Sequence, residues 1–301
     1  MKIFKTALFS LILLSFVNCK KEASEKTQIE ENKDSTLVAD IHKEYYGIYT
    51  GEFLGKERIY SEESGEFYDN EDLRHITLKI NRITKDSVYG QSITNGVQRP
   101  FRGLFNSDSK SFVLDEPGND KTDGRFELKL KSDSLLGNWT VFKKTAVKIP
   151  TKKLKLIKKE FVYNPNFMLD ENSELIDWSN PKDFIEKYTT EEGKTETYTS
   201  SKNRIASDAV FTINASKQKI IEKDIKNLRK LDLEIIKNSV FARHGYAFKK
   251  ETYRNFFEST DWYIPVSNNV DSELSPLEKD NVALLNRFIK YAEDKYDSFS
   301  R

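Results

Sequence analysis

The stretch His75-Ile76-Thr77-Leu78-Lys79-Ile80 alternates polar and apolar side chains with a period of two. The same alternation returns in residues 125–131 and 153–163. Because successive side chains of a β-strand point to opposite faces of the sheet, this pattern is typical of strands that bury one face. It predicts an antiparallel β-domain over residues 44–165.

Turn-forming sequences separate these segments, for example Asn95-Gly96 and residues 117–120. We expect about eight strands, at 46–54, 73–83, 87–94, 97–105, 111–116, 124–131, 134–143 and 153–163. Short sequential strands with tight turns predict a meander that closes into a small barrel. A barrel of this size is either filled by its own side chains or holds one small ligand. We expect it to be filled, and ligand binding is the alternative.

Residues 166–219 are expected to connect this domain to a second one. Pro165 and Pro181 interrupt regular structure at its start. Within the connector we expect a short helix over 181–188, an exposed loop over 189–203 and a short strand over 209–213.

From residue 219 the apolar period changes from two to that of a helix. The spacing predicts helices over residues 221–231, 232–244 and 252–258, and a last one that begins after Ser275. Ser275, Pro276 and Glu278 have the order of a capping box with proline at the first helical position. We therefore expect a small, mainly helical domain over residues 220–298, and the fold class is α+β.

The first residues of the chain predict export. Lys2 and Lys5 precede an almost purely apolar run over residues 7–17. This run is too short for a membrane-spanning helix and has the length and flanks of a secretory signal. Cys19, the single cysteine of the chain, follows directly.

Residues 14–19 resemble the lipobox of bacterial lipoproteins, although Phe16 and Asn18 depart from its usual residues. The resemblance implies that residues 1–18 are a signal peptide and that the thiol of Cys19 is lipidated. It implies an exported outer-membrane lipoprotein that faces the periplasm or the cell surface. Residues 19–43 are charged, polar and free of aromatic side chains, so we expect a flexible tether there.

The composition excludes several classes of protein. Lys and Arg number 49 and Asp and Glu number 48, a formal net charge of +1, which argues against a nucleic-acid binder that depends on a basic excess. Three histidines and one cysteine, without metal-ligand spacing, argue against zinc, iron–sulfur or disulfide scaffolds. We therefore expect no metal, no cofactor and no nucleic-acid partner.

The sequence Phe241-Ala242-Arg243-His244-Gly245-Tyr246 resembles the motif of the YARHG domain, with Phe241 in place of the first tyrosine. The similarity covers residues from about 222 to 296, including the aromatic cluster around Trp262. It implies a small, mainly helical, extracytoplasmic bacterial domain that is often found in lipoproteins and has no established activity.

The candidate binding residues are Arg243, His244, Tyr246, Trp262 and Tyr263. Arg243 and His244 suit the last turn of a helix, where cations meet free carbonyl groups. We expect them to cap the helix and to bridge to Asp261, Glu258 or another local carboxylate. The alternative is a pair that holds an anionic ligand or serves in acid–base catalysis. Trp262 and Tyr263 are expected to pack as core, or alternatively to form a platform for a glycan or peptide.

No catalytic residue is assigned, because the local sequence fixes no nucleophile beside Arg243 and His244. The patterns favour a binding module whose partner is an envelope protein, a glycan or a peptide. The alternatives are an envelope hydrolase that uses Arg243 and His244, and a structural spacer. A deep cleft with carboxylates converging on His244 would favour the hydrolase. A packed motif with an open barrel mouth would favour ligand binding.

Overall fold

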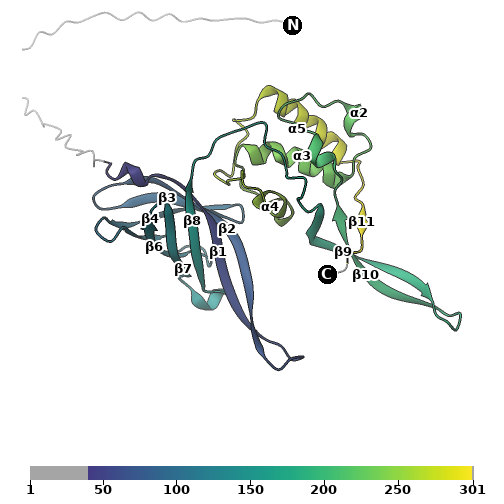
Figure 1. Cartoon of the computed structure of the whole chain (residues 1–301), viewed down its shortest axis with the longest axis horizontal. Helices are drawn as coiled ribbons and strands as arrows, with labels where there is room; N and C mark the ends of the chain where they lie inside the picture. Colours follow the sequence, from purple (N-terminus) through teal and green to yellow (C-terminus); the bar gives the residue numbers. More distant parts are fainter. Residues whose placement is uncertain (1–39, 300–301) are drawn as a thin grey trace, which may run out of the picture. The chain divides into compact units, whose positions relative to one another are not determined.

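A computed structural model describes residues 40–299 of the chain (Figure 1). The predicted signal peptide 1–18, Cys19 and the predicted tether as far as residue 39 lie outside the described residues. In residues 40–299, none of the helices combines the length and the apolar character that crossing a membrane requires. The described chain has the expected α+β architecture, with an antiparallel barrel first and a mainly helical part after it.

The barrel is a continuous meander in which each strand pairs antiparallel with the next, and β8 pairs with β1 to close it. Its strands are β1 (Gly47–Tyr60), β2 (Phe67–Ile83), β3 (Val88–Thr94), β4 (Val97–Asn106), β5 (Ser111–Asp115), β6 (Gly124–Lys131), β7 (Ser134–Val141) and β8 (Thr151–Lys159). They confirm the predicted meander. β1 and β2 run on past their predicted ends as a long hairpin, with Tyr60 opposite Phe67 at its tip (Figure 1).

The alternation that predicted the strands also builds the barrel core. Ile76, Leu78 and Ile80 are each at most 1% exposed. Along β6 the apolar side chains are buried and the charged side chains between them are exposed. Each fully buried side chain of this size stabilises the fold by about 1.5–3 kcal/mol, so the inward rows are the main source of barrel stability.

One end of the barrel is closed by the segment that precedes β1. The one-turn helix η1 (Lys43–Tyr45) brings Tyr45 and Tyr46 against the core, where Phe105 joins them. The hydroxyl of Tyr46 accepts a hydrogen bond from the N–H of Ile83 (2.8 Å). The connections after β3, β5 and β7 lie at the opposite end of the barrel, because the strands are antiparallel.

The second part, residues 160–299, combines five helices with a three-stranded sheet of order β11-β10-β9. Its elements are β9 (Ile176–Thr189), β10 (Thr195–Ile205), α1 (Ala209–Thr212), α2 (Glu222–Ile225), α3 (Lys230–Arg243), α4 (Glu251–Glu258), α5 (Pro276–Ile289) and β11 (Tyr296–Asp297). Its core gathers apolar side chains of α3, α4 and α5, among them the fully buried Ile235, Phe257 and Leu285.

A buried ionic cluster joins the small sheet to the helices. Arg204 on β10 lies 2.8 Å from Asp177 on β9 and 3.0 Å from Glu234 on α3. Asp294, which precedes β11, lies 3.4 Å from the same guanidinium. Several carboxylates around one buried arginine fix the position of each element.

Three predictions for the connector are wrong. The predicted helix 181–188 is part of β9, and the predicted loop 189–203 is mostly β10. The threonines of this region favour strands because they are β-branched, and β9 is an edge strand, where Pro181 is tolerated. The predicted strand 209–213 is the short helix α1, since a run of so few apolar residues fits either structure.

Candidate functional site

The motif residues lie where helix α3 ends. The N–H of Gly245 donates to the carbonyl of Ala242 (2.9 Å), and the N–H of Tyr246 donates to the carbonyl of Phe241 (3.0 Å). These are the two hydrogen bonds of a Schellman motif. Gly245 has a φ of +73°, a left-handed conformation that glycine adopts without steric cost. The glycine of the motif therefore ends the helix, as its sequence position predicts.

Replacing Gly245 with alanine is expected to lower the free energy of unfolding by about 2–5 kcal/mol. The left-handed backbone costs a residue with a Cβ about 1–2 kcal/mol. The new atom would also lie 2.5 Å from Cγ2 of Val266, and such overpacking costs about 1–3 kcal/mol. Gly193→Ala is the matched control, because Gly193 has a φ of +79° and open space around the added atom. Urea denaturation measures the free energy of unfolding of both variants. If Gly245→Ala and Gly193→Ala lower it equally, the contact with Val266 contributes nothing.

Arg243 is almost fully buried, with 1% of its surface exposed. Its Nε donates to the carbonyl of Phe167 (2.6 Å) and its Nη1 donates to Oγ of Ser216 (3.1 Å). Its Nη2 lies 3.1 Å from Sδ of Met168. Burial lowers the pKa of the guanidinium to about 10, which leaves it charged at neutral pH. The side chain therefore fastens residues 167–168 and Ser216 to the end of α3. These partners are a carbonyl, a hydroxyl and a thioether, so the expected bridge from Arg243 to a carboxylate is wrong.

His244 faces a carboxylate of the last helix, α5. Its Nε2 lies 3.2 Å and 3.1 Å from the two carboxylate oxygens of Glu278. The ring of Tyr163 stacks on the imidazole, with 4.3 Å between the ring centres. Glu278 also accepts a hydrogen bond from the N–H of Ser275 (2.9 Å), which confirms the predicted capping box. One carboxylate thus caps α5 and holds the histidine of the motif.

Stability in acid is expected to depend on Glu278. Burial by itself would raise the pKa of this carboxyl group, but hydrogen bonds from His244, Ser216 and Ser275 outweigh burial and lower the pKa from 4.5 to about 2. A carboxyl group with a depressed pKa stabilises the fold above its unfolded pKa, and this stabilisation is lost as the pH falls from about 4.5 to about 2. At about 1.4 kcal/mol per pKa unit, the loss is about 3 kcal/mol.

Urea denaturation of the protein and of Glu278→Gln between about pH 6 and pH 2 measures this contribution. Glutamine keeps the acceptor oxygen and removes the titration. The free energy of unfolding of the variant should therefore fall less steeply in acid. If the free energy of unfolding falls with pH in parallel for the two proteins, the titration of Glu278 does not contribute to stability in acid.

Tyr246, Trp262 and Tyr263 belong to the aromatic core around the motif. The hydroxyl of Tyr263 donates to the carbonyl of Tyr246 (2.7 Å). The indole N–H of Trp262 donates to the carbonyl of Met168 (2.8 Å), and its ring stacks on Phe167 with 5.3 Å between centres. Tyr263 is buried and the other two are half-buried. The structure therefore brings the sequence-predicted residues of the motif together in a packed region.

A cavity of about 360 Å³ opens at the end of the barrel opposite η1. It is lined by Phe53, Asp72, Ile76, Thr94, Asn95, Val97, Arg99, Glu116, Thr122, Phe126, Trp139, Val147, Lys148, Ile149 and Lys152. The barrel interior is filled by its own side chains as expected, except at this end, where the cavity remains. The side chains of Ser92 and Thr94 on β3 are short, so they fill less of the interior than the apolar residues of the other strands.

Glu116 is the most deeply buried charged group of this cavity, with 6% of its surface exposed. Its carboxylate accepts hydrogen bonds from Oγ of Ser92 (2.6 Å), the N–H of Gly124 (2.9 Å) and the indole of Trp139 (3.2 Å). Burial raises the pKa of Glu116 above its ordinary value in spite of these bonds. The ring of Trp139 meets that of Phe53 edge to face at 5.6 Å, so the carboxyl group holds an aromatic wall in place.

Charged side chains of both signs surround the mouth of the cavity. Nζ of Lys152 lies 2.5 Å from the carboxylate of Asp72. Arg99 donates to Oγ1 of Thr122 (2.8 Å), and its Nε lies 3.0 Å from Asp123. The side chains of Lys152 and Arg99 are 15% and 18% exposed. The ion pairs therefore hold two cations in position, with part of each still open to solvent.

The residues of the barrel cavity were not predicted from the sequence, although the alternation of side chains contains a signal for them. Arg99 stands two residues before the buried Phe101, and Lys152 stands two residues before the buried Leu154. A residue two positions from an inward residue of the same strand also points inward. Charged residues in the inward rows therefore mark an interior that is not purely apolar.

The three histidines lie on different elements: His42 precedes η1, His75 is on β2 and His244 ends α3. In the part of the chain that the structure describes, no group of three or more histidine, cysteine, aspartate or glutamate side chains is placed to hold a metal ion.

Residues 209–289 match the YARHG domain, so the chain contains this domain from the start of α1 to the end of α5. The match begins before the predicted residue 222 and leaves the barrel outside it. A search of curated proteins and a search of solved structures found no match to the chain.

Proposed function

We propose that this protein is a lipid-anchored binding protein of the bacterial cell envelope, and that the mouth of its barrel takes up one small amphipathic ligand. The observation that carries the proposal is the cavity of about 360 Å³ at one end of the closed barrel. Small-molecule sites typically measure about 300–1,000 Å³ and combine an apolar lining with a few placed polar groups. The barrel cavity has this size and this composition.

The residues that line the cavity indicate the chemistry of the ligand. Its apolar part would lie between Phe53, Phe126 and Trp139, and its polar end would meet Arg99 and Lys152 at the mouth. At about 30 Å³ per water molecule, the cavity has the volume of about 12 waters. This volume suits a molecule with one to three rings or a short alkyl chain.

The surroundings of Arg243 and His244 support a structural role for the motif. A hydrolase would need the imidazole to reach a substrate, but Tyr163 stacks on the ring and Glu278 occupies its Nε2. Neither Arg243 nor His244 lines the barrel cavity. The packed motif and the open barrel mouth together favour ligand binding over the hydrolase and over the spacer.

We also propose that Cys19 is lipidated after removal of residues 1–18, and that the protein is held at the outer membrane, facing the periplasm or the cell surface. The support is the apolar run followed by the lipobox-like sequence. Besides the membrane, the proposed partners are an envelope protein, a glycan or a peptide, and not a nucleic acid. Cys19→Ala should move the protein from the membrane fraction to the soluble fraction, and a variant that stays with membranes would refute the anchor.

Titration with 8-anilinonaphthalene-1-sulfonate, an aromatic sulfonate of suitable size, tests the barrel site. We expect a rise in its fluorescence that saturates at one molecule per chain. Indole-3-acetate and octanoate, added at millimolar concentration, should displace it. Failure of all three compounds to bind would overturn the proposed ligand class.

A further inference from the structure

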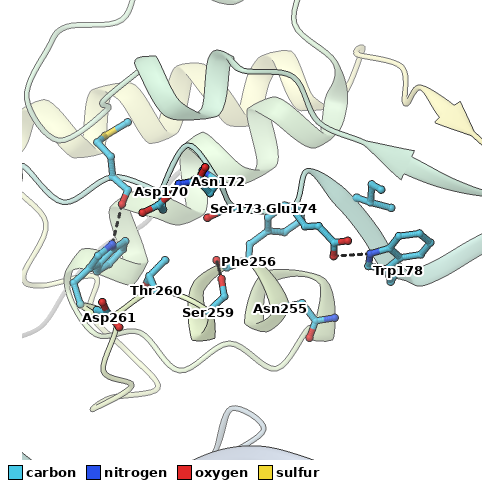
Figure 2. A pocket seen from close by; sticks show the side chains of 13 residues that line it. Asp170, Asn172, Ser173, Glu174, Trp178, Asn255, Phe256, Ser259, Thr260 and Asp261 are labelled. Atoms are coloured by element: carbon cyan, nitrogen blue, oxygen red, sulfur yellow. Dashed lines mark hydrogen bonds between the residues drawn. The ribbon is translucent and has the colours of Figure 1, made fainter. Parts of the chain in front are cut away.

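A second cavity, of about 560 Å³, lies in the part of the chain that contains the YARHG domain (Figure 2). Its lining includes three carboxylates, two tryptophans and one phenylalanine, namely Asp170, Glu174, Asp261, Trp178, Trp262 and Phe256. None of these residues lines the barrel cavity. The two cavities are therefore separate sites.

The cavity lies between two segments of chain. Figure 2 shows the lining side chains of two segments on opposite sides. One side has Asp170, Asn172, Ser173 and Glu174, and the other has Asn255, Phe256, Ser259, Thr260 and Asp261. Asp170 and Asp261 lie toward one end of the view, whereas Glu174 and Trp178 lie toward the other end. The buried ring of Phe256 contributes apolar surface between the two ends.

The two tryptophans of the cavity are held by hydrogen bonds of their indole N–H groups. Trp262 donates to the carbonyl of Met168 (2.8 Å), and Trp178 donates to Oε2 of Glu174 (2.7 Å). Trp262 is also stacked on Phe167. Rings fixed in this way present a preformed surface to a ligand, which reduces the entropy cost of binding.

The charge of the lining has one sign. Asp170, Glu174 and Asp261 contribute three carboxylates, and the lining includes no lysine, arginine or histidine. Ser259 and Thr260 follow the last turn of α4, and the C-terminal end of a helix carries partial negative charge. Tryptophan faces attract cations through the quadrupole of the ring. Carboxylates, helix end and aromatic rings therefore all favour a positively charged ligand.

We propose that this cavity binds a short peptide segment that carries two basic side chains. One ammonium or guanidinium group lies with Asp170, Asp261 and Trp262, and the other lies with Glu174 and Trp178. The stem of the peptide lies over Phe256. A neutral oligosaccharide could also stack on tryptophan, but its binding would depend little on the three carboxylates or on salt.

The test uses the peptide Ac-Lys-Ala-Lys-NH₂ and its arginine analogue Ac-Arg-Ala-Arg-NH₂, followed in ¹H–¹⁵N spectra. We expect the indole signals of Trp178 and Trp262 to shift in a saturable way, while that of Trp139 in the barrel stays in place. The apparent Kd should rise several-fold between about 0.05 M and 0.3 M salt, because the ligand and the carboxylates are exposed to screening. The acidic peptide Ac-Glu-Ala-Glu-NH₂ should cause no shift.

The triple variant Asp170→Asn, Glu174→Gln, Asp261→Asn removes the charge and keeps the acceptor oxygens that bind Asn172 and Trp178. It should bind the basic peptides at least tenfold more weakly. A triple variant of the exposed residues Glu62, Glu63 and Glu66 to glutamine changes the net charge equally at the tip of the β1–β2 hairpin, and it should bind normally.

Three results would overturn the proposal: no shift with either basic peptide, an equal shift with the acidic peptide, or unchanged affinity in the first triple variant. A shift of Trp178 and Trp262 with cellotriose but not with the basic peptides would assign the cavity to a glycan instead.

Discussion

Replacing Arg243 with alanine is expected to lower the free energy of unfolding by about 3–5 kcal/mol. The arginine is among the largest fully buried side chains in residues 40–299. Its removal leaves a void at the end of α3 and takes away the hydrogen bonds to the carbonyl of Phe167 and to Oγ of Ser216. The void and the missing hydrogen bonds both weaken the attachment of residues 167–168 to the end of α3.

Two further variants separate this role from a general effect of charge. Arg287→Ala removes an exposed arginine of α5 that pairs with Glu222, and exposed ion pairs contribute about 0–1 kcal/mol. Arg243→Lys keeps the charge but loses the forked geometry, so its loss should fall between the two. Urea denaturation measures all three. If Arg243→Ala lowers the free energy of unfolding as little as Arg287→Ala does, Arg243 does not fasten residues 167–168 to α3.

Most of the barrel follows from local chemistry. The alternation around Ile76 and the turn pair Asn95-Gly96 each specify a strand or a hairpin without reference to distant residues, and the eight strands lie close to their predicted positions. The capping box at Ser275 and the glycine end of α3 are equally local, and both are present in the structure. Patterns that span a few residues were therefore sufficient for these elements.

Features that depend on partners distant in sequence could not be predicted in this way. The β9–β10 hairpin gains from cross-strand contacts, such as the pair of Tyr188 and Tyr198 with ring centres 5.9 Å apart. The carboxylate that holds His244 comes from Glu278, 34 residues further on. The same holds for the barrel cavity, since the unfilled volume depends on the side chains of several strands at once.

Replacing Val97 with tryptophan is expected to weaken the binding of 8-anilinonaphthalene-1-sulfonate by about 10–100-fold. Val97 lines the cavity at the start of β4, so a larger ring would occupy volume that the ligand needs. Steric overlap of this kind costs about 1–3 kcal/mol. The middle of that range corresponds to a 10–100-fold change in Kd, since about 1.4 kcal/mol is tenfold. A fluorescence titration gives the two dissociation constants.

Val113→Trp is the matched control for this variant. Val113 is exposed to nearly the same extent as Val97, 36% against 38%, but it lies on the outer face of β5 between the inward Phe112 and Leu114. Val113→Trp should leave the Kd for 8-anilinonaphthalene-1-sulfonate unchanged. If the two variants bind the probe equally well, the probe does not enter the barrel.

The central claim, that the barrel mouth is a ligand site, is tested most directly by the indole signals in ¹H–¹⁵N spectra. The three tryptophans of the chain report on two separate cavities. Trp139 lines the barrel cavity, and Trp178 and Trp262 line the other one. During titration with 8-anilinonaphthalene-1-sulfonate we predict a saturable shift of the Trp139 signal, with Trp178 and Trp262 unchanged. A Trp139 signal that stays in place while the probe binds would contradict the claim.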